Sequence, residues 1–401
     1  MNLNPERYRW VIFSPGRKIN DFGRALAKVV GKYSPVILVE DLISARRRPW
    51  KILFRGRTKN IPGIPRGTSY KIWHTPERFP ILSALPRKLN VRRLVQEINR
   101  LVPSENRLVV YDRPSQYNLA GELGERLSIY FAVDDLTLTL AGGSIKGELE
   151  AEKRLLEKVG IVICISENLA QRIRKRLPLN SKSFIHVLPN GYDPQIFDPQ
   201  KKWLEPDALQ NVPHPRVLVA GHISERIDWE GIKGASQLCP QWIWIFIGPA
   251  DSGMKEKIRL YVGNRGFWHP PVTYTQTPGW IKHSDACAVP YRLNSFTLAS
   301  HPLKAMEYLA MGKPVLCTRV PSLKCYDGVT EWVEEGVGES YARALNRILR
   351  QNGNLEMETM RMRAVANDSW DARIDQFRKI VLEGLNSASK SKFGLDPQGG
   401  S

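Results

Sequence analysis

The sequence predicts an α/β protein with two doubly wound, parallel-sheet domains that face each other across a cleft. Three observations support this fold class. Short apolar runs alternate with amphipathic stretches in both halves of the chain. A segment rich in Pro, Asn and Asp, 190–216, separates the two halves. A chain of 401 residues is longer than a domain with a single hydrophobic core usually is, so two domains are expected.

In the first half, apolar segments rich in Val, Ile and Leu read as strands that are buried on both faces. Between them, 21–33 and 92–102 repeat apolar residues every three or four positions, as helices packed on a sheet do. The predicted strands are RWVIFS (9–14), PVILVE (35–40), SYKIWH (69–74), RLVVYD (107–112), SIYFAV (128–133), GIVICIS (160–166) and FIHVLP (184–189).

The second half repeats this pattern, so we expect a second sheet of the same kind. Its predicted strands are RVLVAG (216–221), WIWIFIG (242–248), PVTYT (271–275), ACAVPY (286–291) and KPVLCT (313–318). The expected organisation is an N-terminal domain, a linker, a C-terminal domain, a last helix and a disordered tail, at 1–190, 191–213, 214–369, 370–387 and 388–401.

Composition excludes several classes of protein. The hydrophobic fraction of 42% is ordinary for a globular chain, and no apolar run approaches the 18 residues of a membrane span. The first residues, MNLNPERYRWVIFSP, lack the apolar core and cleavage site of a signal peptide. The five cysteines form no C-x-x-C pair, which indicates buried free thiols in a reducing cytoplasm rather than disulfides or zinc.

The net charge of +19 is concentrated near the N-terminus. Residues 1–100 hold 22 Lys and Arg against 6 Asp and Glu, a net +16, which leaves +3 for the remainder. The stretches 45–60 and 78–93 mix these cations with Trp, Phe, Ile and Leu, which suits an anionic membrane surface. A solvated basic face without a partner is the alternative. Nucleic acid is not an expected partner, because no helix-turn-helix, RNP-type or zinc motif is present.

The segment HPLKAMEYLAMGKPVLCT (301–318) predicts a helix over 302–311 that is followed by a strand. Pro302 suits the first turn of a helix, where its missing N–H costs nothing. Gly312 suits a left-handed cap, and Pro314 prevents the helix from continuing. The helix then begins at the carboxyl end of the strand before it, where ligands bind in doubly wound folds.

Lys304 and Glu307 are three residues apart, so they share one face of this predicted helix. The free N–H groups and the dipole of a helix N-terminus favour an anion such as a diphosphate, and Lys304 adds a positive charge. Glu307 lies one turn further on, where its carboxylate could accept hydrogen bonds from both hydroxyls of a ribose. The alternative is a surface ion pair without a ligand, worth about 0.3–0.5 kcal/mol.

This segment resembles the nucleotide-sugar-binding segment of GT-B glycosyltransferases, which have two Rossmann-like domains. It is similar to bacterial cell-surface polysaccharide enzymes whose motif reads roughly P-L-K-x-x-E-Y-x-A-x-G-K-P-V. The resemblance is continuous over about 128–380 and weaker over 1–127. It implies that the last helix crosses back to the N-terminal domain. Other segments in the matching order are VLPNGYDPQIF, VAGHISERIDWE, FIGP, WIKHSDACAVPYRLN and NDSWDARIDQF.

The resemblance implies a role for each matching residue. Glu307 matches the glutamate that holds the ribose, and Lys304 matches the lysine that neutralises the diphosphate. Arg226 matches a basic residue near the phosphates, with a plain surface arginine as the alternative. Gly221 permits close approach of the backbone to the nucleotide. Tyr291 ends its strand at the cleft and could contact the nucleotide, with an ordinary half-buried tyrosine as the alternative. The loop residues around the phosphates are Ser300, Pro302 and Leu303.

One departure concerns the mechanism. Many retaining enzymes of this fold have a second glutamate where this chain has Ala299, so inversion is favoured. An inverting transferase needs a base to deprotonate the acceptor hydroxyl. YFAVDDLT (130–137) resembles the strand end that carries the catalytic aspartate of membrane-associated glucuronosyltransferases, and the match falls on Asp134. Asp135 is the alternative base, and a turn or helix-cap pair is the alternative role for both.

The expected enzyme moves a sugar from a nucleoside diphosphate, UDP rather than GDP, to a glycan or lipid-linked glycan on the cytoplasmic face of a membrane. No metal or other cofactor is expected, because Lys304, Arg226 and the helix N-terminus would stabilise the leaving diphosphate and no D-x-D motif is present. His222 and His301 lie near the phosphate loops, and each is interpreted first as an uncharged surface or core residue. The remaining alternative is an epimerase-like or binding protein of the same shape.

Overall fold

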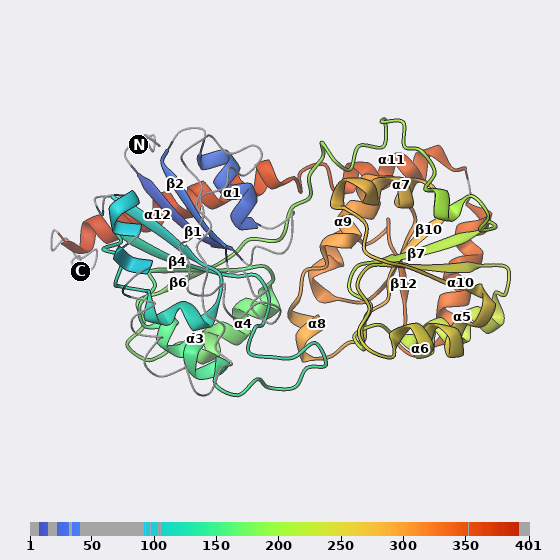
Figure 1. The fold of residues 1–401 in the computed structure, drawn as a ribbon, viewed down its shortest axis with the longest axis horizontal. Helices are drawn as coiled ribbons and strands as arrows, with labels where there is room; N and C mark the ends of the chain where they lie inside the picture. Colours follow the sequence, from blue (N-terminus) through green and yellow to red (C-terminus); the bar gives the residue numbers. More distant parts are fainter. Residues whose placement is uncertain are drawn as a thin grey trace, which may run out of the picture.

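The chain forms two α/β domains that lie side by side and are linked by two crossing segments (Figure 1). Each domain is built on a six-stranded sheet in which every pair of neighbouring strands is parallel. The computed structural model describes residues 8–14, 22–31, 34–40, 92, 94–96, 98–102, 104, 106–351 and 353–392.

The N-terminal sheet has the strand order β2-β1-β3-β4-β5-β6. Its strands are β1 (Arg9–Ser14), β2 (Val36–Glu40), β3 (Arg107–Tyr111), β4 (Leu127–Ala132), β5 (Ile161–Cys164) and β6 (Phe184–Val187). Its helices are α1 (Phe22–Val30), the 3-10 helix η4 (Pro114–Asn118), α3 (Glu148–Leu156) and α4 (Glu167–Arg176). The predicted strand at 69–74 and the basic stretch 45–60 lie outside the described residues, as does nearly all of 78–93.

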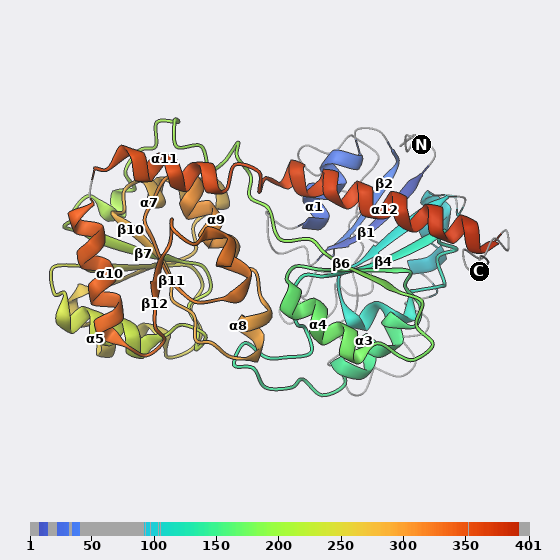
Figure 2. The ribbon, with the colours of Figure 1, turned by 180° about the vertical axis from the view of Figure 1, so that it is seen from behind.

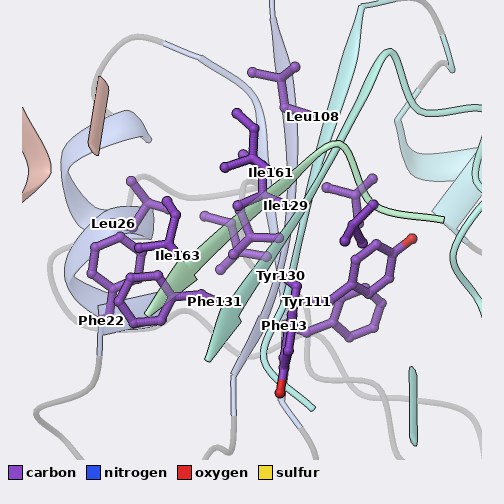
Figure 3. Packing of buried hydrophobic residues seen from close by; sticks show 14 of the residues in the cluster. Phe13, Phe22, Leu26, Leu108, Tyr111, Ile129, Tyr130, Phe131, Ile161 and Ile163 are labelled. Carbon is purple, nitrogen blue, oxygen red and sulfur yellow. The ribbon is translucent and has the colours of Figure 1, made fainter. Parts of the chain in front are cut away.

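Aromatic side chains fill the core of this domain, because both faces of a parallel sheet are covered. Phe22 on α1 stacks on Phe131 of β4 with ring centroids 3.9 Å apart, and Phe13 stacks on Tyr111 at 5.4 Å (Figure 3). The apolar faces of the helices and the apolar strands thus pack into one continuous core around this sheet.

The last helix, α12 (Trp370–Lys392), belongs to the N-terminal core although it follows the C-terminal domain in the chain. Trp370, Ile374 and Phe377 are buried in the same cluster as the residues of β1 and β4. Figure 2 shows α12 returning from α11 across the domain boundary. The helix continues to Lys392, past the start of the tail predicted at 388.

The C-terminal sheet has the strand order β12-β11-β10-β7-β8-β9. Its strands are β7 (Arg216–Ala220), β8 (Ile243–Ile247), β9 (Gly266–His269), β10 (Ala286–Val289), β11 (Val315–Thr318) and β12 (Glu331–Val333). Its α-helices are α5 (Trp229–Leu238), α6 (Met254–Val262), α7 (Thr277–Lys282), α8 (Ser295–Ala299), α9 (Leu303–Ala310), α10 (Gly338–Arg350) and α11 (Leu355–Ala364). Its 3-10 helices are η5 (Asp207–Leu209), η6 (Gly263–Arg265), η7 (Tyr274–Gln276) and η8 (Pro321–Tyr326).

The prediction of a strand at 271–275 is wrong. The strand that pairs with β8 is β9, which ends at His269, and Tyr274 begins η7 instead. Two prolines, Pro270 and Pro271, follow β9, and neither has an N–H to donate to a neighbouring strand. The apolar residues beyond them therefore cannot extend the ladder.

The cysteines are free thiols, as predicted, and four of them are buried while Cys325 is exposed. Burial raises the pKa of the thiols of Cys164, Cys287 and Cys317. None of the helices among the described residues is both long and apolar enough to cross a membrane.

The two segments that join the domains run side by side. Tyr192 pairs with Ser369 in a short parallel bridge, and the N–H of Trp370 donates to the carbonyl of Tyr192 at 2.9 Å. Gly191 makes this approach possible, because a Cβ at that position would lie 2.8 Å from the nitrogen of Trp370. The linker and the start of α12 therefore form one connection between the domains.

Candidate functional site

Helix α9 follows β10 and the short helix α8, and it spans Leu303–Ala310, one residue shorter at each end than the predicted 302–311. Pro302 occupies the N-cap position and offers no side-chain hydrogen bond to the first turn. Met311 is the C-cap residue, and Gly312 adopts the left-handed conformation with a φ of +72°. The first turn carries no acidic residue, so nothing on the helix itself offsets the positive end of its dipole.

Lys304 and Glu307 form an ion pair on α9 in which the carboxylate is buried and the lysine is half-buried. The Nζ of Lys304 lies 2.6 Å from Oε2 of Glu307, whose side chain is 0% exposed. The hydroxyl of Tyr274 donates to Oε1 of Glu307 at 2.8 Å. An exposed pair would leave both charges in water, whereas here the carboxylate is fully buried and the lysine is 23% exposed.

Tyr274 is a site residue that the sequence analysis did not identify. Its ring packs edge-on against Phe197 of the linker, with centroids 5.1 Å apart, and Nζ of Lys304 lies 5.6 Å from its centroid. Thr273 and Gln276 form a capping box around η7, and their spacing in TYTQ is the signal that could have predicted a helical turn here.

Arg226, Tyr291 and Gly221 form a second group at the carboxyl ends of β7 and β10. The guanidinium of Arg226 lies 4.7 Å from the centroid of the Tyr291 ring, and Ile227 bridges to Tyr291 through the backbone. Gly221 has a φ of +134°, a conformation that other residues rarely adopt. Its carbonyl packs on Gly248, where a Cβ would lie 1.9 Å from that oxygen. Arg226 is thus held against an aromatic ring rather than extended into solvent.

The loop before α9 contains Ser300 and His301, and both are buried. The Ser300 hydroxyl donates to the carbonyl of Thr297 at 2.8 Å, so its side chain closes the end of α8. Burial, reinforced by the positive charge of Arg373, lowers the pKa of His301 to about 3. His301 is therefore a neutral core residue. His222, by contrast, is partly exposed and its Nε2 lies 2.6 Å from a carboxylate oxygen of Asp251.

The two candidate bases after β4 have different surroundings. Asp135 is buried, and its carboxylate accepts two hydrogen bonds from Arg176, at 3.0 and 2.8 Å, and one each from Arg172 and Thr137. Burial by itself would raise the pKa of Asp135, but the bonds from Arg176 and Thr137 outweigh it and the pKa is lowered. A carboxylate so firmly held in its ionised form is a poor proton acceptor, which favours the half-buried Asp134.

Ala299, which stands where many retaining enzymes have a glutamate, is 0% exposed. It belongs to the hydrophobic cluster of the N-terminal domain, and its carbonyl accepts a hydrogen bond of 2.6 Å from Ser166 at the start of α4. A glutamate there would place its carboxylate against the other domain. Across the described part of the chain, no three His, Cys, Asp or Glu side chains gather as a metal site would require.

Residues 214–351 match the family model described as Glycosyl transferases group 1. This range includes the contacts of Glu307 on α9 and the contact between Arg226 and Tyr291. Among curated proteins, TuaH of Bacillus subtilis (strain 168), named as a glycosyltransferase of teichuronic acid biosynthesis, is 27% identical over 239 residues. The matched region covers 58% of this chain and 59% of TuaH, less than two thirds of either protein.

Solved structures share the fold over nearly the whole chain. Sucrose-phosphate synthase from Thermosynechococcus elongatus has a TM-score of 0.70 at 16% identity and covers 95% of this chain and 100% of its own. HepE from Anabaena, in complex with UDP and glucose, has a TM-score of 0.64 at 16% identity, with 93% and 99% covered. The fold is GT-B. The resemblance to GT-B glycosyltransferases of polysaccharide biosynthesis is confirmed.

The neutral state of His301 predicts how stability depends on pH. Between pH 6.5 and about 3 the unfolded chain binds a proton at His301 that the folded chain does not bind. The free energy of unfolding should therefore fall as pH falls through this window, by about 1.4 kcal/mol per pH unit from this residue. Urea unfolding of the wild type and of His301→Gln, from about pH 7 to about pH 4, measures it. The variant should show the shallower dependence, and parallel curves would contradict the assignment.

Proposed function

We propose that this protein transfers a sugar from a nucleoside diphosphate sugar, UDP-linked in preference, to a glycan or lipid-linked glycan. The observation that carries the proposal is the buried carboxylate of Glu307 on α9, which Lys304 on the same helix and the hydroxyl of Tyr274 on η7 both contact. A buried carboxylate beside a lysine and a helix N-terminus suits a ribose and a diphosphate bound together. The family match and a neighbour solved with UDP and glucose support the same donor class.

In this proposal the leaving diphosphate is stabilised by charges that are fixed before it arrives. The N-terminus of α9 supplies oriented N–H groups, and Lys304 supplies a positive charge beside them. Arg226 is positioned by its contact with Tyr291 at the ends of neighbouring strands. We propose that these groups make a divalent metal unnecessary.

The proposed base is Asp134, and the proposed stereochemical course is inversion. Asp134 would accept the proton of the acceptor hydroxyl as that oxygen attacks the anomeric carbon and the bond to the diphosphate breaks. Two observations support this choice. Asp135 is committed to Arg176 and Arg172, and Ala299 leaves no acidic group at the second glutamate position of retaining enzymes.

We further propose that the acceptor is presented at an anionic membrane surface on the cytoplasmic side, where the protein binds peripherally. The support is the net +16 of residues 1–100 and the mixture of cationic and apolar residues in 45–60 and 78–93. The relative named for teichuronic acid biosynthesis agrees with a cell-surface glycan as the acceptor class.

Binding of nucleotides tests the donor site directly. UDP should bind by calorimetry with and without Mg²⁺, more tightly than GDP or ADP. Glu307→Gln removes the charge that would strengthen the hydrogen bonds from a ribose, so binding should weaken about 10- to 100-fold. Glu356→Gln on the exposed face of α11 is the matched control and should bind UDP like the wild type. Absence of UDP binding by the wild type would contradict the proposed donor.

The roles of the two aspartates are separated by paired variants. Asp134→Asn should lower kcat by about 100- to 10,000-fold with little change in the KM for the donor, because only the proton transfer is lost. Asp135→Asn should instead lower the free energy of unfolding by about 1–3 kcal/mol, because it removes a buried charge that Arg176 holds and leaves Arg176 with Glu152 as its partner. Measured activity with a glycan acceptor in Asp134→Asn at the wild-type level would exclude Asp134 as the base.

Membrane binding is tested by sedimentation with phosphatidylglycerol and phosphatidylcholine vesicles. Binding should require the anionic lipid and should decrease with added salt, since each surface cation contributes about 1 kcal/mol. Replacing Arg46, Arg47 and Arg48 by Ser should weaken binding, whereas the same change at Lys255, Lys257 and Arg259 on α6 should not. Equal binding to both lipids, or none at low salt, would contradict membrane docking by the N-terminal domain.

A further inference from the structure

The segment that leads into α9 is held by its carbonyl groups. Three consecutive residues each accept a hydrogen bond from a side chain. The carbonyl of Ala299 accepts from Ser166 at 2.6 Å, that of Ser300 from Ser322 at 2.8 Å, and that of His301 from Asn190 at 2.9 Å. Ser166 begins α4 of the N-terminal domain, and Asn190 lies where the chain leaves that domain. Two of the three bonds therefore come from the side of the other domain.

The Ser166 hydroxyl has two functions at once. It accepts a hydrogen bond of 3.1 Å from the N–H of Leu169, which caps α4, and it donates its single proton to Ala299. Ser166 is 3% exposed and Ala299 is 0% exposed, so water does not compete for this bond. A hydroxyl has one proton to donate, and here it is committed to the other domain.

The orientation of the loop follows from these bonds because the peptide group is planar. Fixing the carbonyl oxygen of one residue also fixes the N–H direction of the next. The peptide planes after Ala299, Ser300 and His301 are therefore all set before the chain reaches Pro302 and the first turn of α9. This turn is where the proposed function places the diphosphate.

Helix α4 also reaches the proposed base. Its last two turns carry Arg172 and Arg176, which hold the carboxylate of Asp135 directly beside Asp134. Its N-cap residue, Ser166, contacts the loop before α9, and α4 and α8 lie side by side at the domain boundary (Figure 1). One rigid helix of ten residues thus touches the loop at the donor site and the turn that carries the base.

We infer that Ser166 and Asn190 are positioning residues, through which the N-terminal domain sets the conformation of the loop that receives the diphosphate. The inference rests on the proposed function. A loop that is ordered by bonds from the other domain loses less freedom when a ligand binds. By linkage, a nucleotide that binds this loop stabilises the arrangement of the two domains by the same free energy.

The test compares UDP with UMP, which lacks the second phosphate. Ser166→Ala and Asn190→Ala should each weaken UDP binding by calorimetry about 2- to 10-fold, the contribution of one hydrogen bond. The affinity for UMP should change less in these variants, because UMP has no β-phosphate for the loop to contact. Ser166→Thr keeps both the cap and the donated proton and should bind UDP like the wild type.

The matched control is Ser183→Ala. The Ser183 hydroxyl donates to the carbonyl of Val159 at 2.6 Å, the same distance as Ser166 to Ala299, but inside the N-terminal domain. This variant should leave the UDP affinity unchanged. A general loss of stability would instead affect Ser183→Ala and Ser166→Ala alike.

The outcomes separate the inference from the function on which it rests. If the wild type does not bind UDP, the proposed function fails. If UDP binds and depends on Glu307, but Ser166→Ala and Asn190→Ala bind it like the wild type, the inference is overturned and the function stands. If Ser166→Ala does not fold, Asn190→Ala alone decides, because Asn190 caps no helix. A selective loss of UDP affinity in the folded variants supports the inference.

Discussion

The ion pair between Lys304 and Glu307 is the interaction on which the candidate site depends. Glu307 is fully buried, and removing a carboxylate from water costs several kcal/mol that its partners only partly return. The Nζ of Lys304 lies 2.6 Å from one carboxylate oxygen, and the hydroxyl of Tyr274 donates to the other at 2.8 Å. An apolar pair of similar volume would stabilise α9 as well or better. The charge is therefore better explained by a ligand than by stability.

The site gains its shape from contacts between segments that are distant in the chain. Tyr274 reaches Glu307 from the turn after β9, and the hydroxyl oxygen of Tyr308 on α9 accepts a hydrogen bond from the backbone N–H of Ala220 at the end of β7. Helix α12 then returns the chain to the N-terminal core, where Phe377 is buried. The two domains therefore contact each other both at the connecting segments and at the loop before α9. These contacts fix where the turn that carries Asp134 lies relative to the proposed donor site.

Periodicity and local chemistry predicted most of the fold. The strands around Val11, Leu218 and Ile245 are buried on both faces and their apolar runs are unambiguous. The cap of α9 followed from Pro302 and Gly312. The prediction of a strand at 271–275 failed because it followed the β-branched composition of this run and not the two prolines, Pro270 and Pro271, which have no N–H to continue the ladder from β9. Tyr274 was missed for the same reason.

Side-chain environment could not be derived from the sequence in the same way. Asp134 and Asp135 are adjacent and chemically identical, and the contacts of Asp135 with Arg172 and Arg176, 37 and 41 residues further along the chain, are not encoded locally. The contacts of Ser166 and Asn190 with the loop before α9 span 133 and 111 residues, and no local pattern encodes such pairs. The resemblance indicated Lys304 and Glu307 as a nucleotide site, but the contact of Tyr274 with the buried Glu307 appears only in the folded structure.

A crystal structure of the chain with UDP tests the central claim most directly. The account predicts the ribose hydroxyls within hydrogen-bond distance of Glu307, and the diphosphate at the first turn of α9 beside Lys304. The loop at 299–302 should keep its bonds to Ser166 and Asn190. A nucleotide bound elsewhere, with the Lys304–Glu307 pair untouched by it, would show that the buried ion pair is structural and would contradict the account.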